Sequence, residues 1–185
     1  MQLTALKQDV ITELAAVYNQ VKDEAIMNLV EEIVRAKRVF IYGLGRERLM
    51  LQAFAMRLMH LGVQVYMVGD VTTPGISEGD LFITSSGTGH LSTVAALQSI
   101  AQNAKARIVF ITAHPEAPLP RAADAVIKIP AQTMKDSSQN KTSRQPMGSL
   151  FEQAQLLLLD TAVILLQERL QQKDEDMEKR HTNLE

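Results

Sequence analysis

The apolar positions of the first 36 residues recur every three or four residues. They are Leu3, Leu6, Val10, Leu14, Val17, Val21, Ile26, Val30 and Ile33. This spacing is typical of helices that bury one face against a core. We therefore expect residues 1–36 to form an N-terminal helical segment, either two helices or one bent helix, packed on the rest of the chain.

From residue 38 onward, short apolar runs alternate with segments of helical period. Five runs rich in β-branched and aromatic residues predict buried strands at 38–42, 64–68, 80–84, 107–112 and 125–129. Helices are expected at 49–61, 91–101, 119–123 and 148–170, a mobile polar loop at 130–146, and a charged helical tail at 171–185. Such alternation indicates an α/β fold, a five-stranded parallel sheet in flavodoxin-like order with helices on both faces.

Composition narrows the classes of protein that fit. A chain of 185 residues suits one domain, and aromatic residues at 4% leave a mainly aliphatic core. The net charge of −2 argues against a nucleic-acid partner, and the absence of cysteine removes disulfides, thiolate nucleophiles and Cys-type zinc sites. The N-terminus lacks a signal-peptide pattern, and we find no apolar run of the roughly 20 residues that span a membrane. We expect a cytoplasmic protein.

The segment after the third predicted strand carries the clearest chemical signal. Residues 85–90 read Ser-Ser-Gly-Thr-Gly-His and lead directly into a helix. Ser85, Ser86 and Thr88 offer hydroxyls, Gly87 and Gly89 allow close backbone approach, and the helix N-terminus favours negative charge. The segment predicts a phosphate cradle; the simpler alternative is a helix cap with a flexible turn.

Residues 43–48, after the first strand, suggest a second interpretation. They read Gly-Leu-Gly-Arg-Glu-Arg, which begins like a dinucleotide-binding turn with Asp70 as a ribose ligand. Arg48 stands where that motif needs a third glycine for close helix–strand approach. A nicotinamide cofactor is therefore the weaker alternative, and Arg46 is instead a candidate partner for phosphate or a sugar hydroxyl.

Several segments together resemble the 6-phospho-3-hexuloisomerases, small enzymes built on a sugar-isomerase (SIS) domain. The resemblance rests on residues 54–62, 72–74, 86–89, 145–152 and 179–185, in order along the chain. It implies that residues 37–185 form the SIS domain with a C-terminal helical tail, in one domain overall. It also implies interconversion of 3-hexulose 6-phosphate and fructose 6-phosphate in the ribulose monophosphate route, without metal or organic cofactor, in a homotetramer.

The resemblance also implies roles for individual residues. Glu152 resembles the proposed base that moves a proton through an enediol, a task that suits a carboxyl whose pKa is raised by partial burial. His181, in the charged tail, is the second candidate, as a proton shuttle or a donor that polarises the carbonyl, and we expect it to enter a neighbouring subunit's site. An exposed tail histidine with no role is the alternative. We expect His60 to be a packed core histidine and His114 to lie in a loop.

The sequence departs from the family pattern at two turns. Where the family has Gly-x-Gly-Arg-Ser-Gly, this chain has Glu47 and Arg48, and where the family has Glu-Thr after the cradle, it has His90 and Leu91. A carboxylate at Glu47 repels a phosphate dianion unless Arg48 offsets it or Glu47 turns outward. These departures leave two alternatives: an isomerase of a different sugar phosphate, or a SIS protein that senses a sugar phosphate without converting it.

Overall fold

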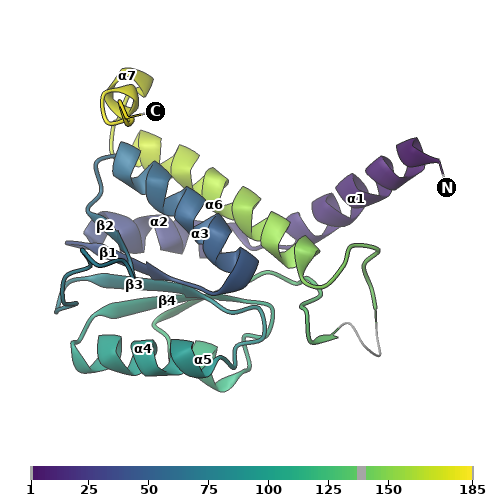
Figure 1. Cartoon of the computed structure of the whole chain (residues 1–185), viewed down its shortest axis with the longest axis horizontal. Coiled ribbons are helices and arrows are strands. Elements are labelled where there is room, and N and C mark those ends of the chain that lie inside the picture. The colour runs from purple at the N-terminus through teal and green to yellow at the C-terminus, as the bar shows by residue number, and fades with distance from the viewer. Residues whose placement is uncertain (1, 137–140, 185) are drawn as a thin grey trace.

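A computed structural model describes residues 2–136 and 141–184 (Figure 1). In the described residues, five parallel strands form one sheet in the order β2-β1-β3-β4-β5. The strands are β1 (Val39–Tyr42), β2 (Val65–Met67), β3 (Leu81–Ser85), β4 (Arg107–Thr112) and β5 (Ala125–Lys128). The helices are α1 (Leu3–Tyr18), α2 (Asp23–Arg35), α3 (Gly45–His60), α4 (Ser92–Asn103), α5 (Pro118–Arg121), α6 (Ser149–Arg169) and α7 (Asp174–Glu178).

The sheet confirms the predicted α/β class and strand order. Successive residues of each strand point to opposite faces, so each strand contributes to two cores. Ile41 and Ile83, which are partners in the β1–β3 register, belong to the larger core, and their neighbours Phe40 and Phe82 belong to the smaller one. Helices α2, α3 and α6 cover the first face and α4 and α5 the second (Figure 1). Because both faces are covered, the strands are mainly apolar, as the sequence indicated, and the charged residues Arg107 and Lys128 stand at strand ends.

The N-terminal segment forms two separate helices, the first of the two expected arrangements. Helix α1 extends away from the body of the molecule toward the N-terminus (Figure 1). At its C-terminal end the Tyr18 hydroxyl lies 2.5 Å from Thr161 Oγ1 on α6.

Helix α3 begins at Gly45, four residues earlier than the apolar period predicts. Gly45 has φ +56°, a left-handed conformation that glycine adopts without the steric cost of a side chain. The chain can therefore turn from β1 directly into the helix. This early start places Arg46 and Glu47 in the first turn, at the carboxyl end of the sheet.

Two sequence-based expectations about the C-terminal half were wrong. Helix α6 is 21 residues long and is apolar enough to cross a membrane by length and composition, although we found no such run. Half of its apolar window is buried inside the fold, which is the pattern of a core helix. The tail is less helical than expected, since among its described residues, 171–184, only Asp174–Glu178 form a helix.

The segment 130–146 is not simply a mobile surface loop. Residues 137–140 lie outside the described part of the chain, but the flanks are ordered by hydrogen bonds. Gln132 Oε1 accepts the amides of Thr142 and Ser143 at 2.8 and 3.2 Å, and Ser143 Oγ donates to Glu13 at 2.6 Å. Thr133, Ser143 and Gln145 are all buried. The flanks thus form part of the wall at the carboxyl end of the sheet.

Candidate active site

A cavity of about 490 Å³ opens at the carboxyl ends of the strands. This is where an open parallel sheet places its ligands. Its walls come from the first turn of α3, the loop after β3, the segments that flank 137–140, and the first turn of α6. The polar residues that line it are Arg46, Glu47, Ser86, Thr88, Thr133, Lys135, Ser149 and Glu152.

The loop from Ser85 to Gly89, predicted as the phosphate cradle, is tightly folded. Its amides at Ser86 and Gly89 donate to Ile111 O and Ser86 O, at 3.1 and 3.0 Å. Gly89 has φ +68°, and a Cβ there would lie 2.6 Å from Ala117 Cβ, so the turn depends on glycine. Ser86 and Thr88 line the cavity, whereas Ser85 lies fully buried behind Glu47.

The Glu47 side chain turns inward onto this loop. Its Oε1 and Oε2 accept the Gly87 amide at 3.1 and 3.2 Å, and Oε2 also accepts the Ser85 hydroxyl. Arg48 does not offset this charge, because its guanidinium donates to Val68 O at 3.0 Å and lies 3.6 Å from Asp70. Neither of the two expectations for Glu47 holds: it is not neutralised by Arg48 and it does not point outward.

Glu47 has an altered acidity because of this position. Burial raises the pKa of the Glu47 carboxyl, and the negative charge of Glu152 raises it further. The hydrogen bonds from Ser85 and Gly87 act in the opposite direction but do not cancel the effect of burial. The cavity therefore contains a carboxyl that holds its proton more strongly than an exposed glutamate.

Arg46, in the first turn of α3, forms an ion pair with Glu152, in the first turn of α6. Arg46 Nε lies 2.5 Å from Glu152 Oε2, and the Glu152 side chain is 14% exposed whereas that of Arg46 is 57% exposed. Arg46, expected to contact phosphate or a sugar hydroxyl, here contacts the candidate base. The pair brings the two predicted residues into one cavity and orients the Glu152 carboxylate.

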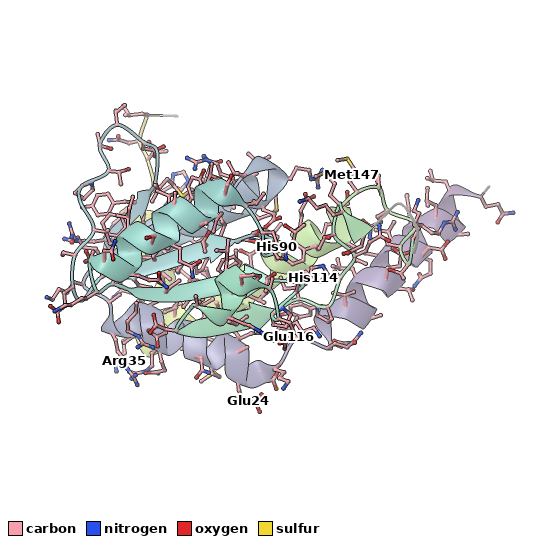
Figure 2. All side chains as sticks on the ribbon, turned by 90° about the horizontal axis from the view of Figure 1, so that it is seen from below. Glu24, Arg35, His90, His114, Glu116 and Met147 are labelled. Atoms are coloured by element: carbon pink, nitrogen blue, oxygen red, sulfur yellow. The ribbon has the colours of Figure 1, made fainter. Side chains whose placement is uncertain are left out.

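His90 lies in an adjoining cavity of about 440 Å³, which shares Thr88, Thr133 and Lys135 with the first. Figure 2 shows His90, His114 and Glu116 close together, and all three line this second cavity. His114 is in a loop as expected, and its Nε2 lies 3.3 Å from Asp136 Oδ2. The structure thus separates His90 from the cavity that contains Glu152.

Comparison with known proteins decides the family. The SIS domain model matches residues 32–163, which is more than half of the chain. The chain belongs to the SIS domain family.

Similarity within this family extends over nearly the whole chain. This SIS domain protein is 40% identical to the 3-hexulose-6-phosphate isomerase of Mycobacterium gastri over 98% of its own length and 89% of the relative's. It is 34% identical to the 3-hexulose-6-phosphate isomerase of Bacillus subtilis over the full length of both. A crystal structure of a Methanococcus jannaschii protein, for which that same molecular function was inferred, superimposes with a TM-score of 0.81 at 32% identity, covering 99% and 100% of the two chains.

In this SIS domain protein, His181 lies far from Glu152 of the same chain. Its ring stacks on that of His60, with centroids 5.3 Å apart, at the C-terminal end of α3. Glu47 and His60 are 13 positions apart on α3, which corresponds to about 20 Å along a helix. Figure 1 likewise shows α7 and the C-terminus at the far end of α6. His60 itself is buried, which confirms that it is a packed core histidine.

Sequence reasoning missed Thr133, Lys135 and Gln155. Thr133 and Lys135 line the cavity because the segment after β5 folds back over it. Their position after the fifth strand was a usable signal, since every strand of a parallel sheet ends at the same edge. Gln155, fully buried on α6, lies with its Oε1 3.4 Å from Ser85 Oγ. Among the described residues, no group of three or more His, Asp or Glu side chains is arranged to hold a metal ion.

Proposed function

We propose that the protein is a cofactor-free isomerase that interconverts 3-hexulose 6-phosphate and fructose 6-phosphate. The observation that carries the proposal is that Glu152 and the Ser86–Thr88 loop line one cavity. A shared cavity supports the proposal, because an isomerase of this type needs a proton acceptor and a phosphate site that one substrate can reach together. The identity of 34–40% with 3-hexulose-6-phosphate isomerases over nearly the whole chain supports the same substrate. We expect the enzyme to act in the cytoplasm.

The reaction moves a carbonyl from C3 to C2. Glu152 removes the proton from C2 while the oxygen on C3 gains a proton, which gives a 2,3-enediol. The oxygen on C2 then loses its proton, and protonated Glu152 returns a proton to C3. One carboxylate can serve both carbon atoms because they are neighbours. Arg46 orients Glu152 through the 2.5 Å ion pair and also lines the cavity, where it can contact a sugar hydroxyl.

We assign the phosphate group to the loop of Ser86, Gly87, Thr88 and Gly89, with Glu47 beside it in the cavity and Ser85 buried behind Glu47. Hydroxyls and backbone amides at the N-terminal side of α4 suit an anion. Lys135 lines both cavities, where it adds positive charge, and His90 lines only the second cavity. The sugar then extends toward Glu152 on α6.

We infer that the active unit is a homo-oligomer, a tetramer by analogy with the family, in which His181 serves a neighbouring copy. His181 is distant from the cavity of its own chain, so a catalytic role requires a second copy. A mixing experiment tests this: Glu152→Gln and His181→Ala proteins are co-refolded and assayed. Activity well above that of either variant alone is expected, because some sites then combine an intact Glu152 with an intact His181. Activity no higher than the sum of the two parents would contradict the role of His181.

The decisive experiment is turnover of 3-hexulose 6-phosphate, measured as fructose 6-phosphate formed, beside a panel of other ketose and aldose phosphates. Preferred turnover of 3-hexulose 6-phosphate supports the proposal. Preferred turnover of another member of the panel would uphold the isomerase activity but refute 3-hexulose 6-phosphate as the substrate.

The inward position of Glu47 favours a second candidate function, a SIS protein that binds a sugar phosphate without converting it. Glu47 occupies the Gly87 amide that a catalytic phosphate site would use. Calorimetry distinguishes the two candidates, because a sensor binds a member of the sugar-phosphate panel and converts none of them.

A further inference from the structure

The candidate phosphate loop already holds an acidic group of the protein itself. Both Glu47 carboxyl oxygens accept the Gly87 amide, at 3.1 and 3.2 Å, and the Ser85 hydroxyl donates to the same carboxyl. The adjacent amides of Ser86 and Gly89 donate to acceptors inside the protein. A phosphate group that enters this loop therefore meets Glu47 at close range.

The charged groups around Glu47 come from three elements. Arg46, on α3 itself, is paired with Glu152 of α6, and Lys135 of the segment after β5 lines the same cavity. The next arginine, Arg48, points to Val68 and Asp70. The two arginines nearest in sequence are thus both engaged elsewhere, and Glu152 adds a second negative charge.

We propose that Glu47 makes phosphate binding at this loop depend on a proton, which the Glu47 carboxyl and the phosphate share in an O–H···O hydrogen bond. This inference rests on the proposed function, in which the loop binds the phosphate of the sugar. A protonated carboxyl is a donor, whereas a carboxylate only accepts and repels a phosphate dianion. Burial favours the protonated form of Glu47. The proton comes from solvent, and no bond to carbon or phosphorus changes.

This arrangement makes Glu47 a residue that determines specificity for the phosphate group, and it predicts that binding takes up a proton. Binding of the phosphorylated sugar takes up a proton wherever Glu47 is ionised in the free protein. Where one proton is taken up, the dissociation constant rises about tenfold per pH unit, by linkage. The second pKa of a phosphate group is about 6, so above pH 7 the ligand is mostly a dianion and adds little to this dependence.

The test is calorimetric titration of fructose 6-phosphate into the full-length protein between pH 7 and 9. At each pH, two buffers of different ionisation enthalpy report the number of protons taken up. For the unmodified protein we expect a dissociation constant that rises with pH, toward tenfold per unit, with uptake approaching one proton. Fructose should show neither effect, because it has no phosphate.

Glu47→Gln is the informative variant, because it keeps an acceptor for the Gly87 amide but cannot bind the proton. Its dissociation constant for fructose 6-phosphate should stay within about twofold from pH 7 to 9. Glu116→Gln, an equal charge change at the exposed rim of the adjoining cavity, should keep the pH dependence of the unmodified protein. A flat pH profile in the unmodified protein would already contradict the inference, so the test does not depend on whether a variant folds.

Several outcomes would overturn the inference: a flat pH profile in the unmodified protein, release of protons on binding, or a slope that Glu47→Gln retains. Loss of turnover in Glu47→Gln with unchanged, pH-independent binding would make Glu47 a catalytic acid instead. Proton-linked binding without turnover of 3-hexulose 6-phosphate would uphold the inference while the proposed function failed. No binding of fructose 6-phosphate to either protein would refute both.

Discussion

Arg46 Nε lies 2.5 Å from Glu152 Oε2, so an ion pair joins the first turns of α3 and α6 in the cavity that the loop after β3 also lines. The two residues are 106 positions apart in sequence. The pair is partly exposed, so its contribution to stability is small, on the order of 0–1 kcal/mol. Its importance is geometric, because it sets the direction in which the Glu152 carboxylate faces.

Replacing Glu152 by Gln should lower turnover of 3-hexulose 6-phosphate about 100-fold or more. The amide has nearly the same shape but cannot accept a proton from carbon, so affinity for fructose 6-phosphate should stay within a few-fold. Steady-state kinetics and calorimetry measure the two quantities. Glu168→Gln, on the exposed far end of α6, is the matched control and should keep normal turnover. Turnover near the normal rate in Glu152→Gln would make Glu152 a structural residue.

The exposed apolar side chains of α3 and α6 predict a closed oligomer. Leu49, Met56, Leu157 and Ile164 are 55%, 52%, 40% and 59% exposed, and the two helices pack together on one side of the sheet. Exposed apolar surface of this kind is typical of contacts between subunits. Light scattering at micromolar concentration should report a mass well above the 20.5 kDa of one chain.

Ile164→Glu should shift that mass toward the monomer, because it places a charge in the expected interface. The matched control is Ile100→Glu on α4, where the isoleucine is similarly exposed, at 55%, but lies on the opposite side of the sheet. A monomeric unmodified protein would exclude the closed oligomer and the role of His181 in a neighbouring subunit. An equal effect of both substitutions would point to a general loss of folding.

The sequence was sufficient for the fold because each strand carries its own local signal. Phe40 and Ile41 are adjacent apolar residues that enter different cores, which is why the strand appears as a continuous apolar run. The sequence also named the loop after β3 and Glu152 as candidate site residues, and Ser86, Thr88 and Glu152 line one cavity; their roles stay predictions. These predictions depend on the order of the strands and on the spacing of apolar positions, and both can be recognised from short segments of sequence.

The sequence did not reveal features that depend on distant contacts. The flank containing Ser143 is held by Glu13, 130 residues away, so its polar composition suggested only a mobile loop. The direction of Glu47 depends on where α3 begins and on the Gly87 amide 40 residues later. A pattern of apolar positions carries no information on such side-chain directions, so the sequence left open whether Arg48 offsets the Glu47 charge or Glu47 turns outward, and the structure shows neither.

The His60–His181 stack predicts a pH dependence of stability. Burial lowers the pKa of His60, and the nearby Arg57 and His181 lower it further. The unfolded chain therefore binds a proton at this residue more readily than the folded one, and stability falls as pH drops below about 6.5. The thermal midpoint should decrease less between pH 7 and pH 5 in His60→Phe than in the unmodified protein. In His90→Gln, which changes an exposed histidine, the thermal midpoint should decrease as much as in the unmodified protein. Equal decreases of the midpoint in all three proteins would contradict the assignment to His60.

Replacing Glu47 by Ser should tighten the binding of fructose 6-phosphate at pH 8, because it removes a negative charge from the phosphate loop and supplies a hydroxyl. Two like unit charges about 4 Å apart cost roughly 4 kcal/mol at an effective dielectric of 20, and solvent reduces this, so the gain is at most a few kcal/mol. Arg48 points away from the loop, so adding Arg48→Gly should change affinity little beyond the single variant. Fructose should bind equally to all three proteins, since it carries no charge.

Calorimetry with fructose 6-phosphate and fructose on the unmodified protein, the single variant and the double variant measures all three expectations. Equal affinity for fructose 6-phosphate in the unmodified protein and Glu47→Ser would place the phosphate away from Glu47, and the turn after β1 would then not belong to the phosphate site.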